Sequence, residues 1–177
     1  MWAAEAVHVV AADPAWAEAG AAAAVELDVL IAPWLVGEVE HVGSTAVPGL
    51  DAKPVLDLQA PVVDLACAGE VAETLAPHGW NYVPPELDGR QWRRFLVHVT
   101  EDRRTRHLHL LVSGSPRWRE QLAFRDALRA DTALATRYGQ LKRALAAEHP
   151  EDREAYTEGK ADLVRAVLDE APTSEHP

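Results

Sequence analysis

Residues 40–58 read Glu-His-Val-Gly-Ser-Thr-Ala-Val-Pro-Gly-Leu-Asp-Ala-Lys-Pro-Val-Leu-Asp-Leu. Apolar alternation precedes and follows the centre of this stretch, so we expect one strand over 36–42 and another over 55–59. The part between them, 43–54, contains two glycines and two prolines and cannot form one regular element. The stretch therefore predicts two strands joined by a loop, with Asp57 on the second strand.

The loop and the second strand carry side chains that suit a phosphate and a cation. Gly43 has no Cβ, so the backbone amides and the hydroxyl of Ser44 can approach a phosphate closely. Lys53 is a natural point-charge partner for that phosphate, and Asp57 can hold a divalent cation across from it. The alternative is that Gly43 serves only the turn, that Lys53 lies at a solvated corner and that Asp57 caps a loop.

Two histidines further along the chain are candidates for the same site. His107 and His109 are two residues apart in a strand expected over 106–112, so their imidazoles point to one face. With Asp57 they form a His-His-carboxylate set, which suits Zn, Mn or Fe better than Mg. General acid–base or phosphate-facing roles for the pair stay open. His41, directly before the turn, is expected to pin the turn rather than to reach the ligand.

The rest of the chain predicts an α/β (α+β) protein with a mixed sheet and a helical C-terminal third. The strands expected over 92–100 and 106–112 are predicted to pair antiparallel through a connection over 101–105. Residues 84–90 read as a link, and the polar tail 172–177 is expected to fray. The remaining predicted elements are strands over 7–10 and 80–83 and helices over 14–31, 64–76, 116–130, 132–148 and 151–168.

Composition excludes several classes of protein. The chain has 177 residues, 48% hydrophobic and 25% charged, as expected for a single globular domain over 1–177 with its core at about 5–168. Its net charge of −11 argues against non-specific nucleic-acid binding and anionic membranes, although local cations can still hold a small phosphorylated ligand. The single cysteine, Cys67, excludes a disulfide framework, and no apolar run reaches the ~20 residues that span a bilayer. We expect a cytoplasmic protein, with no organic cofactor evident.

The motif resembles the signature of the GrpB (UPF0157) family, in which His-(Val/Ile)-Gly-Ser-Thr leads through Val-Pro-Gly-Leu to Ala-Lys-Pro and an Asp. Here these parts are residues 41–45, 47–50, 52–54 and Asp57. The resemblance covers about 5–168. Its other matching parts are Asp13-Pro14-Ala15-Trp16, His107-Leu108-His109, Leu122-Ala123-Phe124-Arg125-Asp126, Leu128-Arg129, Tyr138, Leu141-Lys142, Tyr156 and Lys160.

This resemblance implies a nucleotidyltransferase-superfamily fold, and GrpB-like domains also occur fused to dephospho-coenzyme A kinases. Members of the superfamily follow the Gly-Ser turn with a strand bearing Asp-x-Asp/Glu, and two metals bridge the triphosphate and the attacking hydroxyl. Asp57 matches the first carboxylate, but Gln59 stands at the second position, where an amide is a poor ligand for Mg²⁺. The residues therefore depart from the standard two-metal set.

Several cations are candidates for ligand binding. Arg93 and Arg94 are adjacent on an expected strand and point to opposite faces, so at most one enters the site. The resemblance favours Arg94, which precedes Phe95 as in the family's Arg-Phe pattern. Arg125 and Lys142 lie on helices expected to pack against the sheet and could close over a ligand, although surface ion pairs are the more frequent outcome for such residues.

The leading hypothesis is a site that binds a nucleotide or another phosphorylated small molecule, with a divalent metal (Mg, Mn or Zn) and nucleotidyl transfer as the reaction. A catalytically inactive binding or folding-accessory module is the first alternative, supported by Gln59. A metal-dependent small-metabolite enzyme without a nucleotide is the second, motivated by the two histidines. The predicted catalytic and metal-binding residues are Asp57, His107 and His109, and the predicted ligand-binding residues are Gly43, Ser44, Thr45, Lys53 and Arg94.

Overall fold

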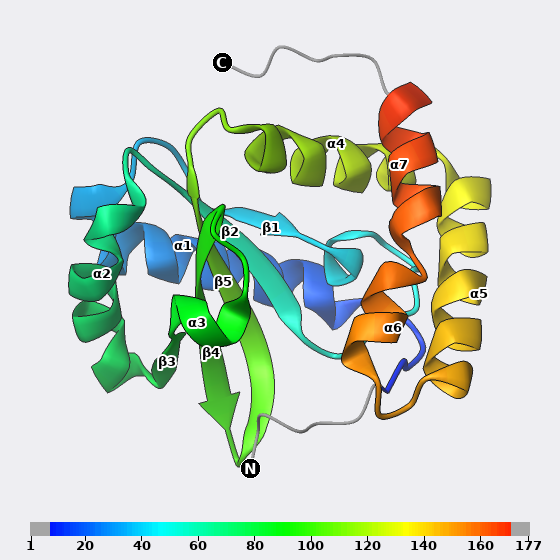
Figure 1. Ribbon diagram of the computed structural model, residues 1–177, viewed down its shortest axis with the longest axis horizontal. Helices are drawn as coiled ribbons and strands as arrows, with labels where there is room; N and C mark the ends of the chain where they lie inside the picture. The colour runs from blue at the N-terminus through cyan, green and yellow to red at the C-terminus, as the bar shows by residue number, and fades with distance from the viewer. Residues whose placement is uncertain (1–7, 171–177) are drawn as a thin grey trace.

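A five-stranded mixed sheet forms the centre of the protein (Figure 1). The computed structural model describes residues 8–170, except for the side chain of Arg153. The strands are β1 (Glu40–Val42), β2 (Leu56–Val62), β3 (Trp80–Val83), β4 (Arg93–Thr100) and β5 (Arg103–Val112). Their order across the sheet is β1-β2-β5-β4-β3, with β2 and β5 parallel and the other neighbours antiparallel. The predicted fold class and mixed sheet are confirmed.

The helices are α1 (Ala15–Leu30), α2 (Ala68–Leu75), α3 (Pro85–Asp88), α4 (Pro116–Ala130), α5 (Thr132–Glu148), α6 (Arg153–Glu158) and α7 (Ala161–Glu170). Helices α4 and α5 have the predicted bounds because Ser115 and Asp131 cap their first turns. Figure 1 shows α5, α6 and α7 grouped to one side of the sheet, which confirms the helical C-terminal third. No helix in residues 8–170 is both long and apolar enough to cross a membrane.

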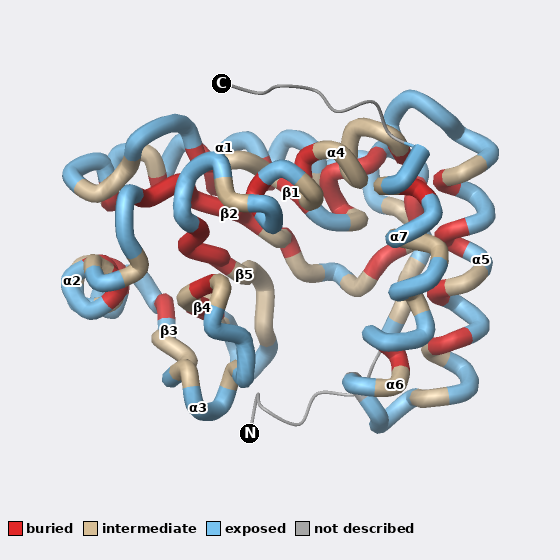
Figure 2. The backbone as a smooth tube through the Cα atoms, turned by 45° about the horizontal axis from the view of Figure 1, so that its top comes forward, coloured by how far each residue is buried: buried red, intermediate tan, exposed pale blue. Residues whose placement is uncertain are grey.

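Helices α1 and α2 cover one face of the sheet. Leu58, Leu108 and Leu110 are fully buried on this face, and they belong to one core cluster with Leu27 of α1 and Leu75 of α2. Figure 2 shows β2 as a mostly buried segment. Because side chains alternate along a strand, the residues between these leucines point to the opposite face, which carries the candidate site.

The opposite face of the sheet meets the C-terminal helices. At one end, Trp118 of α4 packs against Val42 and Leu111. The loop between β1 and β2 packs further along, where Leu50 belongs to one cluster with Tyr138 of α5. This loop is therefore held between the sheet and the helices, which fixes the position of the Gly-Ser turn.

Several strand boundaries differ from the predictions. The strand predicted over 36–42 is reduced to β1, since the Val39 amide donates to the Asp28 carboxylate of α1 in place of a strand partner. Of the strand predicted over 7–10, Val10 forms only an isolated bridge with Ala52. Residue 7 and the tail predicted to fray, 172–177, lie outside the described residues.

The connection between β4 and β5 is shorter than predicted. Glu101 and Asp102 have φ values of 51° and 61°, the left-handed conformation that the two central positions of a type I′ hairpin turn require. The residues predicted to complete the connection, up to Thr105, instead belong to β5. The predicted antiparallel pairing is confirmed, whereas the five-residue connection is wrong.

Three predicted segments also differ in their helices. The helix predicted over 64–76 begins as a 3-10 turn capped by the Asp64 carboxylate and becomes α2 only at Ala68. The link predicted over 84–90 contains α3. The helix predicted over 151–168 is divided into α6 and α7 at Gly159, where a Cβ would collide with the side chain of Leu145. The close approach of α5 explains why the residue at this break is a glycine.

Candidate functional site

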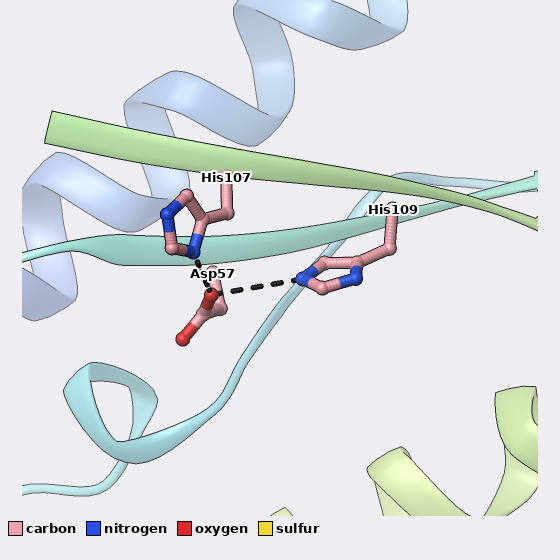
Figure 3. Close-up of side chains that lie close together, drawn as sticks. All are labelled: Asp57, His107 and His109. Atoms are coloured by element: carbon pink, nitrogen blue, oxygen red, sulfur yellow. Dashed lines mark hydrogen bonds and ion pairs between the residues drawn. The ribbon is translucent and has the colours of Figure 1, made fainter. Parts of the chain in front are cut away.

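Strand register brings Asp57, His107 and His109 together. Asp57 lies opposite His107 across the parallel pair β2–β5, and Gln59 lies opposite His109. Figure 3 shows both imidazoles turned toward the Asp57 carboxylate. His107 Nδ1 lies 2.9 Å and His109 Nε2 lies 3.6 Å from Asp57 Oδ1. One potential ligand atom from each residue lies within 4.8 Å of the others, so the three predicted residues form a compact cluster.

The cluster keeps Asp57 ionised. Burial by itself raises the pKa of Asp57, but the interactions with His107 and His109 outweigh burial and hold this pKa well below its usual value. Burial lowers the pKa of His109 to about 4, so its imidazole is neutral at pH 7. Asp57 is therefore an anionic acceptor beside a neutral imidazole.

The turn at Gly43 lies against Asp57. Gly43 has φ 72° and ψ −170°, a combination essentially restricted to glycine. A Cβ at this position would lie 2.6 Å from Asp57 Oδ2. The missing side chain therefore makes room for the carboxylate, whereas the sequence argument assigned this room to a phosphate. The next residue, Ser44, is half-buried. Burial raises the pKa of Tyr138 of α5, and the Ser44 side chain lies near enough to this phenol to offset part of that rise.

His41 and Thr45 hold the turn from the other side. His41 Nε2 lies 3.0 Å from Thr45 Oγ1, and this hydroxyl donates to the Val55 carbonyl. Burial lowers the pKa of His41 to about 4, and its ring occupies space that a Cβ at Gly20 of α1 would fill. The Thr45 side chain is buried and its hydroxyl is already bonded within the turn. His41 thus pins the turn, and the hydroxyl predicted at Thr45 to bind a ligand is directed into the protein.

The three lysines of the chain, Lys53, Lys142 and Lys160, converge beside this turn. The ammonium groups of Lys53 and Lys160 lie 5.1 and 4.2 Å from the centre of the Tyr156 ring. Lys142 lies 4.9 Å from the centre of the Tyr138 ring and donates to the Asp51 carbonyl at 2.5 Å. The three residues are called the lysine cluster below.

Electrostatics show that the lysine cluster is crowded and lies near Asp57. Burial, then repulsion from Lys160, lowers the pKa of Lys142 to about 7 despite the attraction of Asp51 and Asp57. Burial and repulsion from Lys53 lower the pKa of Lys160 to about 8 despite the attraction of Asp57. Burial and the negative charge of Asp57 raise the pKa of Tyr156 to about 12. The charges of the lysine cluster and Asp57 therefore affect one another's pKa values and those of Tyr138 and Tyr156; these residues are called the unit below.

Sequence reasoning identified only part of this unit. Lys53 was predicted as a ligand-binding residue and Lys142 as a cation that could close over a ligand. Lys160, Tyr138 and Tyr156 were given no role in the site. The scarcity of lysine was an available signal, since three lysines stand against fourteen arginines and all three fall within motifs shared with that family. Their convergence depends on how α5 and α6 fold back, which a linear pattern does not contain.

Arg93, not Arg94, reaches the histidines. Arg93 Nη1 lies 2.6 Å from His109 Nδ1, while Nε and Nη2 pair with the two carboxylate oxygens of Asp88 at 2.9 and 2.5 Å. Arg94 lies opposite Leu110, on the face covered by α1 and α2, and donates to the carbonyl oxygens of Arg93 and of residue 91. The expectation that only one of the pair enters the site agrees with this arrangement, but the choice of Arg94 was wrong.

The residues do not provide the carboxylates of a two-metal site. Gln59, at the position of the second carboxylate, is fully buried and donates to the Trp118 carbonyl at 3.4 Å. The residues contributed by β5 at the neighbouring positions are His107 and His109. Within residues 8–170, the group that could hold a metal contains a single carboxylate, that of Asp57. A pair of Mg²⁺ ions bridged by carboxylates therefore does not fit this site.

Other candidate residues lie outside the unit. Arg125 of α4 pairs with Glu40 at 2.6 Å and with Asp126 at 2.8 Å and donates to the His41 carbonyl, so it is held by ion pairs although its side chain is only 10% exposed. One surface pocket of about 340 Å³ is lined by residues that include Arg125, and another of about 360 Å³ by residues that include His41 and Arg129. Neither pocket is lined by Asp57, so the candidate site rests on its chemistry and contacts.

Known proteins are similar to the chain over most of its length. The family model described as GrpB protein matches residues 6–170. A UPF0157 protein of Pseudomonas aeruginosa is 38% identical over 97% of the chain and 70% of its own length. Another, YqkA of Bacillus subtilis, is 30% identical over 93% of the chain, but the chain spans only 47% of that protein. The chain thus spans 47% of one of these relatives and 70% of the other.

Solved structures support the fold. The crystal structure of the conserved protein GrpB from Enterococcus faecalis matches with a TM-score of 0.80 and 31% identity, over 92% of this chain and 96% of that one. The GLD-2/RNP-8 complex and a cytoplasmic RNA terminal U-transferase match with TM-scores of 0.59 and 0.50 at 12% and 14% identity, which shows likeness of fold alone. The fold is therefore nucleotidyltransferase-like, and the chain belongs to the GrpB family.

Proposed function

We propose that the protein binds a nucleotide or another phosphorylated small molecule at the lysine cluster, and that nucleotidyl transfer is its reaction. The single observation that carries this proposal is the convergence of all three lysines of an acidic chain beside Ser44 and Asp57. A solvated surface would not lower the pKa of two lysines to about 7 and 8.

The charge of the cluster favours a ligand with several negative charges. In the described part of the chain, no carboxylate lies within ion-pair distance of Lys142 or Lys160, although the chain has 28 acidic residues. A di- or triphosphate would supply the missing charge, restore the protons of both ammonium groups and relieve their mutual repulsion. Adjacent phosphates also suit ammonium groups that surround one ring, because each lysine acts as a separate point charge.

Nucleotidyl transfer gives these groups separate tasks. An acceptor hydroxyl forms a bond to the α-phosphorus, the bond from that phosphorus to pyrophosphate breaks, and the hydroxyl proton passes to the ionised Asp57 carboxylate and from there to solvent. Charge accumulates on the departing pyrophosphate, where the lysine cluster stabilises it. The proposed position for the α-phosphate is at the turn amides of Gly43 and Ser44, because Gly43 adjoins Asp57 and Ser44 lies near Tyr138, whose ring is beside Lys142. No step is assigned to paired metals, because the carboxylates that such a pair needs are not in the site.

A catalytically inactive binding module is a second candidate, and the burial of Gln59 favours it. Its amide donates to the Trp118 carbonyl inside the protein, so the residue at the second carboxylate position has a packing role. Such a module binds the phosphorylated ligand at the lysine cluster but releases no pyrophosphate. The two candidates therefore agree on binding and differ on turnover.

A thermal-shift series with ATP and with pyrophosphate tests binding. At about 100 times its dissociation constant, a ligand stabilises the folded state by about 2.7 kcal/mol, which is a shift of several degrees for a domain of this size. We expect that shift in the wild type and in Arg143→Met, and its loss in Lys142→Met and Lys160→Met. Arg143 is the matched control because it adjoins Lys142 on α5 but is half-exposed and pairs with Asp51. Equal shifts in all four proteins would contradict the proposal.

Turnover separates the two candidates. Pyrophosphate release from each of the four common nucleoside triphosphates is measured with hydroxyl acceptors, using the wild type and Asp57→Asn. Release that falls at least about 100-fold in Asp57→Asn supports transfer, since loss of a group that acts in the transition state has this size. Binding without release in either protein supports the inactive module.

A further inference from the structure

We infer that Asp88 and Arg93 hold His109 in the tautomer that carries its proton on Nε2, so that His109 faces Asp57 as a proton donor and is not available as a metal ligand. The inference concerns the site described above, but it does not depend on nucleotide binding. Its tests use no nucleotide, so its failure is distinguishable from failure of the proposed function.

Arg93 is fixed from several sides. Its guanidinium pairs with both oxygens of Asp88, and its central carbon lies 4.1 Å from the centre of the Phe95 ring. The side chains of Arg93 and Asp88 are 9% and 5% exposed. A two-point ion pair that is stacked on an aromatic ring and closed to solvent leaves the guanidinium one orientation. In that orientation Nη1 points at His109.

The identity of this neighbour determines the tautomer of His109. A guanidinium has only donors and does not lose its proton in proteins. At 2.6 Å from Arg93 Nη1, His109 Nδ1 must therefore accept, which leaves the proton of the neutral imidazole on Nε2. That nitrogen lies 3.6 Å from Asp57 Oδ1, longer than a formed hydrogen bond but oriented so that the proton faces the carboxylate (Figure 3).

His107 adds an independent argument. Asp57 Oδ1 is an acceptor, so His107 Nδ1 at 2.9 Å carries a proton toward it. The other nitrogen, His107 Nε2, is buried and has no hydrogen-bond partner among the described residues. Both histidines thus turn N–H groups, not lone pairs, toward the point where a metal would lie.

A metal at this point would require both protons to move outward. The proton of His109 would then meet the guanidinium of Arg93, a donor facing a donor, and that of His107 would be buried without an acceptor. Histidines that bind metals ordinarily donate their outer N–H to a carboxylate or carbonyl. The three residues are close enough for the predicted metal, but their outer partners have the wrong chemistry for it.

Arg93 and Asp88 are consequently positioning residues that act through His109. With Oδ1 of Asp57 turned toward the two imidazoles, Oδ2 is the oxygen that lies at the Gly43 turn. The pair thus orients His109, and through it the Asp57 carboxylate, so that one oxygen faces the imidazoles and the other faces the turn.

The first test needs no variant. In ¹⁵N-labelled wild type at pH 7, two-bond nitrogen–proton correlations distinguish the two neutral tautomers of each histidine. We expect His109 as the Nε2–H form, assigned by comparison with His109→Gln. An Nδ1–H form of His109 overturns the inference.

The second test predicts a gain of metal affinity. In Asp88→Asn with Arg93→Gln, the glutamine oxygen can accept a proton from Nδ1 and no buried carboxylate is left alone. Titration with Co²⁺, followed by its visible absorption, should show about tenfold tighter binding or more than in the wild type, the scale on which outer partners tune such sites. The gain should disappear when His109→Gln is added. Arg94→Gln, on the opposite face, is the matched control and should bind as the wild type does.

Wild-type binding of Co²⁺ as tight as in the double variant, with loss of that binding in His109→Gln, overturns the inference. Circular dichroism establishes that each variant is folded. Where the double variant does not fold, the tautomer measurement on the wild type decides the question alone.

Discussion

Replacing Gly43 by alanine tests the contact between the turn and Asp57. Gly43 has φ 72° and ψ −170°, a region in which a residue with a Cβ costs about 1–3 kcal/mol. The new Cβ would also lie 2.6 Å from Asp57 Oδ2, closer than real Cβ contacts allow, so the carboxylate or the turn must shift. We expect Gly43→Ala to lower the free energy of unfolding by more than the backbone term alone and to disturb the hydrogen bond between Asp57 and His107.

Two measurements separate the backbone term from the contact. Gly49→Ala is the control for the cost of a Cβ at positive φ, because Gly49 has φ 74° but nothing lies within 4 Å of the position of its Cβ. A double-mutant cycle with Asp57→Ala isolates the contact between the new Cβ and the carboxylate, since removing the carboxylate leaves the backbone of residue 43 unchanged. Urea unfolding of the four proteins of the cycle gives the coupling energy between the two positions.

The expected coupling energy is about 1 kcal/mol or more, the range that residues in direct contact show. Gly43→Ala should therefore cost less in the Asp57→Ala background than in the wild type. Equal costs in both backgrounds would refute the reasoning, because the room left by the missing Cβ would then serve the turn and not the carboxylate.

Three further predictions concern stability. The pKa of Lys142 is lowered to about 7, so the unfolded chain binds more protons than the folded one between pH 7 and about 10. The free energy of unfolding should therefore rise with pH across this window. Lys142→Met should flatten that rise, as measured by urea unfolding at successive pH values. Replacing Glu101-Asp102 by Asn-Gly suits the left-handed φ of both positions and should raise the unfolding free energy by about 1 kcal/mol, measured the same way. Asp131→Ala removes the acceptor for two amides at the start of α5 and should cost about 1 kcal/mol, with the loss of helical signal on heating as the readout.

The sequence predicted the parts of the fold that local chemistry determines. Helices α4 and α5 have their predicted bounds because their caps, Ser115 and Asp131, are written in the chain next to the elements they start. The shortening of β1 could not be read in this way. It depends on a hydrogen bond between Val39 and Asp28 of α1, two residues that only the fold brings together.

The same division holds for the site. Period-two alternation, a local rule, placed His107 and His109 on one face, and their grouping with Asp57 was a hypothesis. Their approach to Asp57 depends on the parallel register of β2 and β5, which joins residues 50 apart in the chain and was not predicted. The choice between Arg93 and Arg94 was wrong because alternation shows that the two point to opposite faces but not which face carries the site. The structure shows the face through two contacts. Arg93 pairs with Asp88 on α3, a segment that was predicted to be a link, and Arg94 lies opposite Leu110 on the face covered by α1 and α2.

Calorimetry of ATP binding at pH 8, where the phosphates of the free nucleotide are already fully ionised, tests the central proposal most directly. Titrations in two buffers with different ionisation enthalpies report the protons taken up when the anion binds. At this pH, Lys142 and Lys160, with pKa values of about 7 and 8, are partly deprotonated, and a bound anion should restore their protons. The account predicts binding with net proton uptake in the wild type, and weaker binding with less uptake in Lys142→Met. Binding without proton uptake, or unchanged in Lys142→Met, would contradict it.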